Sequence, residues 1–222
     1  MESYYAQKLS ADRLKRVYEM ASPRVKQYLE AEIRHVFGRL INGESVLELG
    51  CGYGRILEGL ASKAGLLVGV DNAPASLQMA AREGQGRYSL ALMNAAHLGF
   101  SDNVFDATLC LQNGISAFKV DSAALIKEAV RVTRSSGRVF FSTYAEAFWP
   151  DRLDWFRQQA GQGLLGPIDE EATGNGVIVC RDGFRATTLS PADFERLTSG
   201  LAGTVQIYMV DNSSLFCEIE PI

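Results

Sequence analysis

The sequence predicts an α/β protein built on a doubly wound, mostly parallel sheet. Short apolar segments alternate with helical segments over residues 45–143, a pattern typical of parallel strands joined by helical crossovers. The chain has 222 residues, of which 47% are hydrophobic, and no linker interrupts this alternation. We therefore expect one domain with one sizeable core over residues 1–222.

The N-terminal residues are expected to form helices. Ser10 can cap a helix that runs through Met20, and Ser22-Pro23 is a cap followed by proline at the first helical position of a second helix, which ends near Leu40. Apolar residues recur at helical spacing in the second helix, so one of its faces should pack on the rest of the protein. We treat residues 1–41 as a helical cap.

From Ser45 the pattern predicts strands that alternate with helices. The strands are expected at 45–49, 66–70, 88–93, 105–111 and 137–143, and the helices at about 54–62, 74–82 and 122–132. The remaining residues, 146–222, are expected to contain a short helix, a Gly-rich loop, a hairpin at Asp182-Gly183, a helix after Ser190-Pro191 and two final strands. We expect the last strand to insert into the sheet against the direction of the others.

Composition favours a small-molecule partner. The formal net charge is -4, whereas affinity for nucleic acid comes mainly from clustered Lys and Arg. The four cysteines form no CxxC pair, which argues against zinc. Neither a signal peptide nor an apolar run of about 20 residues is recognisable. We expect a cytoplasmic protein with reduced thiols, no metal and no contact with membranes.

A glycine-rich turn follows the first predicted strand. Gly50, Gly52 and Gly54 stand at alternate positions, Glu48 precedes them by two residues, and Asp71 closes the next strand. Bare backbone at a strand-to-helix turn suits an adenosine-bearing ligand, and an acid at the end of the second strand can reach its ribose hydroxyls. In the dinucleotide-binding fingerprint the third glycine comes one residue later, so the spacing departs from that motif.

Residues 46–55 and 66–72 resemble motifs I and II of the class I S-adenosylmethionine-dependent methyltransferases. The resemblance continues through residues 92–118 and 124–143 and extends over residues 40 to 145 in all, in the manner of the small-molecule members of the methyltransferase-domain 11 and 25 type. It implies a Rossmann-like, seven-stranded, mostly parallel sheet with one antiparallel strand near the C-terminus. It also implies that residues 42–145 bind the cofactor and that residues 146–222 supply a substrate-side insertion and a hairpin.

By this resemblance, the glycines admit the methionine part of S-adenosylmethionine and Glu48 orients the loop or the cofactor's amino group. Asp71 accepts the ribose hydroxyls, and Asn94, where the family usually has Asp, lies beside the adenine amino group. The residues that the resemblance assigns to the cofactor are Glu48, Gly50, Cys51, Gly52, Gly54, Asp71, Asn72, Asn94, Ala95, Leu111 and Gln112.

The acceptor side is less marked in the sequence. Tyr4 and Tyr5 lie in a leader that folds over the cofactor in relatives with a cap, Asn113 follows the fourth strand, and Tyr144 follows the fifth. His35 and His97 are the candidates for a general base, although both suit ordinary structural roles. Asn113 before glycine is also common turn chemistry.

The expected function is methyl transfer from S-adenosylmethionine to a small molecule by in-line displacement, which leaves S-adenosylhomocysteine. Two alternatives remain: a catalytically degenerate member that binds the cofactor as a regulatory or scaffold protein, and a NAD-dependent oxidoreductase. The acceptor and its reacting atom are open, and we expect a monomer or a homodimer.

Overall fold

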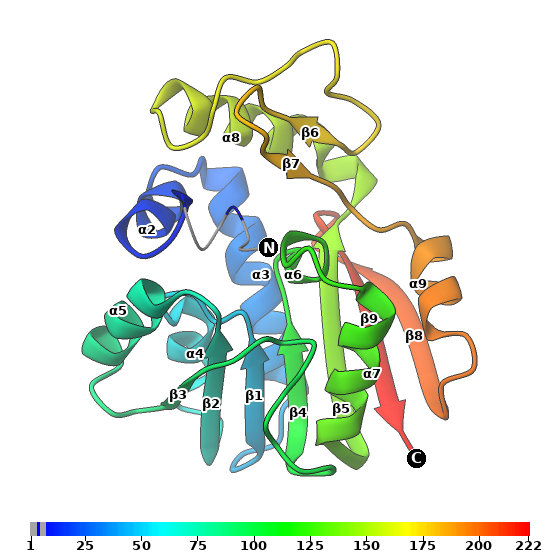
Figure 1. The fold of residues 1–222 in the computed structure, drawn as a ribbon. Helices are drawn as coiled ribbons and strands as arrows, with labels where there is room; N and C mark the ends of the chain where they lie inside the picture. The colour runs from blue at the N-terminus through cyan, green and yellow to red at the C-terminus, as the bar shows by residue number, and fades with distance from the viewer. Residues whose placement is uncertain (1–3, 5–7) are drawn as a thin grey trace.

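A seven-stranded sheet forms the centre of the computed structural model, which describes Tyr4 and residues 8–222 (Figure 1). Its strands, in order across the sheet, are β3 (Ser89–Leu92), β2 (Leu66–Asp71), β1 (Ser45–Leu49), β4 (Phe105–Cys110), β5 (Thr133–Tyr144), β9 (Ser214–Pro221) and β8 (Gly203–Val210). Neighbouring strands are parallel except at β9, which runs antiparallel to both β5 and β8. The predicted fold class is therefore confirmed, including the inserted last strand.

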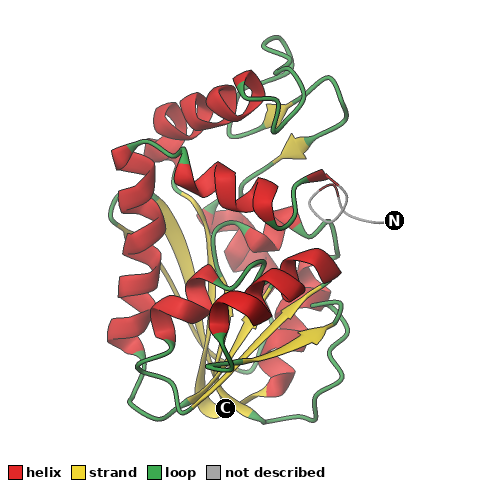
Figure 2. Ribbon diagram, turned by 90° about the vertical axis from the view of Figure 1, so that its left-hand side faces the viewer, coloured by secondary structure: helices red, strands yellow, loops and turns green. Residues whose placement is uncertain are grey.

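Helices cover both faces of the sheet (Figure 2). They are α2 (Asp12–Glu19), α3 (Pro23–Arg39), α4 (Arg55–Leu60), α5 (Pro74–Gly84), α6 (Gly114–Ala117), α7 (Ser122–Val132), α8 (Trp149–Gly161) and α9 (Pro191–Thr198). Several begin at the caps that the sequence predicts. Ser22 accepts the backbone N–H of Val25, Asp121 accepts that of Ala124, and Ser190 forms a capping box with Asp193.

The two faces of β1 contact different helices because successive side chains of a strand point to opposite sides. Leu47 and Leu49 pack in one cluster with α7 and Phe194 of α9, whereas Val46 packs in another cluster with α3 and α4. Glu48 alternates with Leu47 and Leu49, so its carboxyl group lies on the α3 and α4 side of the sheet.

A third apolar cluster lies above the carboxyl ends of the strands. It joins α2, the first half of α3, and α8 to a two-stranded ribbon, β6 (Ile178–Val179) and β7 (Arg185–Ala186), whose turn contains the predicted Asp182-Gly183 pair. In Figure 1 these elements form the upper layer, with the sheet beneath them. Segments far apart in the sequence therefore meet over the edge of the sheet where α/β proteins bind ligands.

Some boundaries differ from the sequence-based expectation. Ser10 does not cap α2, because Ala11 occupies the N-cap position with φ 49°. The backbone N–H of Ala11 donates to the Ser76 hydroxyl. The short helix α6 was not predicted, and β5 starts at Thr133, directly after α7, because Thr133 pairs with Phe105 across a bulge.

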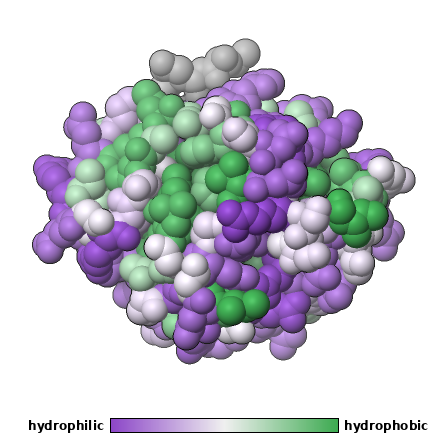
Figure 3. All heavy atoms as spheres, turned by 90° about the horizontal axis from the view of Figure 1, so that it is seen from below, coloured by the Kyte–Doolittle hydropathy of each residue, from purple (hydrophilic) through white to green (hydrophobic). Residues whose placement is uncertain are grey.

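On the underside of the molecule, below the amino ends of the parallel strands, apolar side chains gather in an area that runs from the upper left of the view toward its centre, with polar side chains around it (Figure 3). Among the residues that the structure describes, no helix is both long and apolar enough to cross a membrane.

Candidate cofactor and acceptor site

One pocket lies at the carboxyl ends of β1, β2 and β4, between the sheet and the upper layer. Its floor comes from the glycine turn and from the loops after β2, β3 and β4, and its roof from residues 9–18. Ten of the predicted cofactor residues line this pocket: Glu48, Gly50, Cys51, Gly52, Asp71, Asn72, Asn94, Ala95, Leu111 and Gln112.

The glycine turn brings bare backbone to the pocket floor. Gly50 has φ +73°, a conformation that favours glycine, and a Cβ there would lie 2.3 Å from the Phe118 ring, which would have to move. Gly54 is different: it caps α4 with φ +91° and faces the Tyr88 hydroxyl, and it is not among the lining residues. The third glycine thus serves the turn from strand to helix.

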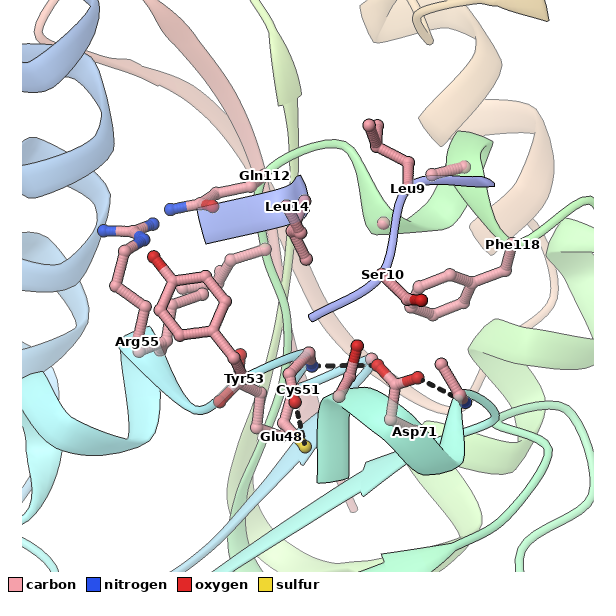
Figure 4. Close-up of a pocket in the computed structure, with 18 of the residues that line it drawn as sticks. Leu9, Ser10, Leu14, Glu48, Cys51, Tyr53, Arg55, Asp71, Gln112 and Phe118 are labelled. Atoms are coloured by element: carbon pink, nitrogen blue, oxygen red, sulfur yellow. Dashed lines mark hydrogen bonds between the residues drawn. The ribbon is translucent and has the colours of Figure 1, made fainter. Parts of the chain in front are cut away.

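Asp71 fastens the turn and faces the pocket. Its carboxylate accepts the backbone N–H groups of Gly52 and Ala73, each at 2.8 Å, and both bonds are drawn in Figure 4. Burial raises the pKa of Asp71, although the backbone N–H bonds oppose this shift. A carboxylate in this position offers acceptor sites to a ligand that carries adjacent hydroxyl groups.

Three buried polar atoms in the pocket have no hydrogen-bond partner among the described residues. They are one carboxylate oxygen of Glu48 (Oε2), one guanidinium nitrogen of Arg55 (Nη2) and the amide nitrogen of Gln112 (Nε2). Buried polar groups are normally paired, so this grouping indicates a binding site for a polar ligand. Two donors and one acceptor are the complement of an α-amino acid, whose carboxylate accepts and whose ammonium donates.

Arg55 begins α4 directly after the glycine turn. Its guanidinium lies 4.9 Å from the centre of the Tyr18 ring, and Figure 4 shows it extending toward the Gln112 amide. This stacking holds a cation at the pocket wall without using its hydrogen-bond donors.

Glu48 is buried beside Arg55, with an exposed fraction of 2%. Burial raises the pKa of Glu48 to about 8, while Arg55 and the backbone N–H of Leu57 oppose the shift and Asp71 adds to it. The proton on Glu48 therefore depends on what fills the pocket.

Aromatic side chains form the wall away from the glycine turn. Tyr18, Tyr144, Trp155 and Phe156 line the pocket there, and the Trp155 indole donates to the Val17 carbonyl. The Arg152 guanidinium lies 4.5 Å from the centre of the Tyr144 ring. Burial raises the pKa of both tyrosines, so their hydroxyls stay protonated at neutral pH.

The other predicted acceptor-side residues lie elsewhere. Asn113 is buried next to the pocket, where its amide accepts from the Thr143 hydroxyl and donates to the Thr187 carbonyl. Tyr4 donates to Asp182 at 2.6 Å and packs against Phe184. Tyr5 lies outside the described residues.

Neither histidine lines the pocket. His35 makes a 2.8 Å hydrogen bond with the Tyr208 hydroxyl and packs edge-on against Phe216, and burial lowers its pKa. His97 is exposed in the loop after β3. Among the pocket residues that the structure describes there is no histidine that could act as a base.

The sequence did not predict the residues that form the roof of the pocket, nor the part that Arg55 plays in it. Leu9, Ser10 and Leu14 line the pocket from above, and Phe118 packs on the glycine turn. Arg55 stands immediately after the glycines and at the start of a helix, and this position was the signal in the sequence that could have identified it as a pocket residue.

The ligand-free protein should become less stable between pH 5 and pH 8. In this interval the unfolded chain has lost the Glu48 proton while the folded protein retains it, so the free energy of unfolding falls as pH rises. In the Glu48→Gln variant the free energy of unfolding should fall between pH 5 and pH 8 by less than in the wild type, and we expect the difference to be on the order of 2 kcal/mol. Urea unfolding at both pH values measures the difference.

The exposed Glu146 provides the control, because the Glu146→Gln variant should follow the wild type. If Glu48→Gln and the wild type changed equally with pH, Glu48 would not retain its proton in the folded protein.

Comparisons with known proteins agree with this architecture. A family described as "Methyltransferase domain" matches residues 46–137. A curated relative, the ubiquinone biosynthesis O-methyltransferase of Alkalilimnicola ehrlichii, is 31% identical over 107 residues, which cover 46% of this chain. The match spans only 42% of the relative's length.

Solved structures share the fold over most of both chains. The PH0226 protein of Pyrococcus horikoshii OT3 superposes with a TM-score of 0.65 at 20% identity, over 90% of this chain and 92% of that one. The N-methyltransferase NodS of Bradyrhizobium japonicum WM9, crystallised with S-adenosylhomocysteine, gives a TM-score of 0.62 at 15% identity over 97% and 95%. At these identities the likeness concerns the fold alone.

Proposed function

Through residues 46–137 the chain belongs to the methyltransferase-domain family of S-adenosylmethionine-dependent enzymes, and on that premise we propose that it transfers a methyl group from S-adenosylmethionine to a small molecule. In this proposal residues 42–145 bind the cofactor, and the cap together with residues 146–222 encloses the acceptor.

The three unpartnered polar atoms are the observation that carries the proposal. Nη2 of Arg55 and Nε2 of Gln112 would donate to the carboxylate of the cofactor's methionine part, and Oε2 of Glu48 would accept from its ammonium group. A nicotinamide dinucleotide has no ammonium group, so it would offer the Glu48 oxygen no charged donor of this kind.

The remaining cofactor residues fit the adenosine part. Asp71 would accept the ribose hydroxyls, and Asn94 and Ala95, which line the pocket beyond Asp71, would lie at the adenine ring. Cys51 and Gly52 would contribute backbone and small side chains only, since burial raises the pKa of the Cys51 thiol and keeps it protonated.

When bound, S-adenosylmethionine supplies an electrophilic methyl group on a sulfonium. The protein then has to hold the nucleophile in line with the methyl group at about 3–3.5 Å and to exclude water. The buried roof residues Leu9 and Val17 and the aromatic wall perform this exclusion. Both tyrosines of the wall are protonated, so the proposed reaction relies on positioning rather than on a base.

We infer that the acceptor is a flat, weakly charged molecule. Tyr18, Tyr144, Trp155 and Phe156 offer ring faces and edges, which favour planar apolar ligands. Hydroxyl-bearing aromatic acceptors come first in a screen because the curated relative is named as an O-methyltransferase, and amines come second because NodS is named as an N-methyltransferase.

Calorimetric titration tests the cofactor, and a mass shift of one methyl group in an acceptor tests the reaction. We expect S-adenosylmethionine and S-adenosylhomocysteine to bind with micromolar dissociation constants and NAD not to bind. Binding of NAD alone would instead favour an oxidoreductase. Cofactor binding without transfer to any acceptor of either group would favour the degenerate scaffold.

A further inference from the structure

Glu32 is a buried carboxylate behind the pocket. It lies on the cap helix α3 with an exposed fraction of 0%. One of its oxygens accepts from the Ser214 hydroxyl at 2.6 Å, and the other accepts from the backbone N–H of Gln112 at 2.9 Å. It therefore binds the cap helix to the turn after β4 and to the start of β9.

Glu32 lies directly behind a residue of the pocket. The Gln112 N–H is shared between Glu32 and the Ser142 hydroxyl, which is 2.8 Å away. Gln112 and Asn113 have φ values of 54° and 63°, in the left-handed region. This backbone conformation costs free energy in residues other than glycine, so it needs the support of such hydrogen bonds. The Gln112 side chain, held in this way, lines the cofactor pocket, and its amide nitrogen has no hydrogen-bond partner within the described part of the chain.

The charges around this end of the pocket do not balance. Arg55 lowers the pKa of both Glu32 and Glu48, so one guanidinium is shared by two buried carboxylates. Neither carboxylate forms a salt bridge among the described residues. Glu48 keeps its proton in the ligand-free protein up to about pH 8. When ligand binding has ionised both carboxylates, this end carries a surplus of one negative charge, which a ligand of net positive charge neutralises.

We propose that Glu32 is a specificity-determining residue of the cofactor site: its buried charge favours the cationic S-adenosylmethionine over the neutral thioether S-adenosylhomocysteine. This inference rests on the proposed function. The two molecules share the adenosine and amino acid parts and differ by the methyl group and the positive charge on sulfur. Because Glu32 does not line the pocket, it acts through its charge and through Gln112, and it is a positioning residue rather than a catalytic one.

The Glu32 carboxyl group gains or loses its proton near neutral pH. Burial raises its pKa to about 7, and the hydrogen bonds from Ser214, Ser142 and Gln112 and the charge of Arg55 oppose the shift. The other titratable groups that interact with it are Tyr18, Tyr28, Cys110 and Tyr144. Binding of a cation should therefore draw a proton off Glu32, whereas binding of the neutral product should do so much less.

Calorimetry on the Glu32→Gln variant at pH 8 tests the inference. Glutamine keeps an acceptor for Gln112 and a donor for Ser214 but removes the charge. We expect S-adenosylmethionine to bind about tenfold more weakly, as for the loss of one nearby charge in a partly screened site, and S-adenosylhomocysteine to be unchanged. The matched control is Glu30→Gln, which removes a carboxylate from the solvent face of the same helix and should change neither affinity.

The wild-type protein provides a second measurement that does not depend on how the variant folds. Titrations at pH 7 in buffers of different ionisation enthalpy should show more protons released on binding of S-adenosylmethionine than of S-adenosylhomocysteine. Equal proton release, or equal weakening of both ligands in Glu32→Gln, would overturn the inference and leave Glu32 as a structural anchor. Failure of the wild type to bind either ligand would overturn the proposed function as well.

Discussion

Replacing Asp71 by alanine is expected to weaken binding of S-adenosylmethionine by about a thousandfold. Two hydrogen bonds from ribose hydroxyls to a carboxylate contribute about 1.5–3 kcal/mol each, and the substitution removes both. It also leaves the backbone N–H groups of Gly52 and Ala73 without their acceptor, so the hydrogen bonds that stabilise the glycine turn are lost. Calorimetric titration of the purified variant measures the loss.

The loss in Asp71→Ala should extend to every ligand that carries the ribose, including methylthioadenosine, which lacks the amino acid part. Asp102→Ala is a suitable control, since Asp102 is an exposed carboxylate paired with Arg131 away from the pocket. Affinity within about threefold of the wild type would show that Asp71 serves only the turn.

The Arg55→Met variant is expected to bind S-adenosylmethionine and S-adenosylhomocysteine about 30- to 100-fold more weakly. The substitution removes a buried donor nitrogen that has no partner among Tyr4 and residues 8–222, and a hydrogen bond between charged groups accounts for a loss of this size. Methionine retains apolar contact with the Tyr18 ring, so the wall of the pocket should stay in place.

The ligand selectivity of the two variants separates their roles. Methylthioadenosine should bind Arg55→Met as well as it binds the wild type, whereas Asp71→Ala should lose it. The exposed Arg82, replaced in the same way, provides the control for the loss of a positive charge. If Arg55→Met lost methylthioadenosine too, the guanidinium would not be specific for the amino acid end.

The sheet and the glycine turn were predictable because their determinants are local. Buried parallel strands read as continuous apolar runs, and a turn that needs positive φ needs glycine, as Gly50 shows. The same local reasoning left Asn113 ambiguous between a turn residue and a ligand-binding residue. Its contacts with Thr143 and Thr187, far away in the sequence, show that it holds the turn.

The charged part of the site was not predictable in the same way. Glu32 follows Leu29 by three residues and Val25 by seven, so it stands on the apolar face of its helix, where a charge is anomalous. The sequence contains that anomaly but not its partners, since Ser214 and Gln112 reach Glu32 only through the fold. The same holds for His35, whose partner Tyr208 lies on β8.

The position of β9 has a consequence for the order of folding. Strands β1 and β2 can pair through one short helical crossover, whereas β9 must bring Ser214 beside Tyr144 and also supplies the pairing for β8. Contacts between residues so distant in the sequence form slowly, because a long loop must close before they stabilise anything. The half of the sheet that carries the glycine turn can therefore form first, and β5 remains an open edge, prone to pair with other chains, until β9 arrives.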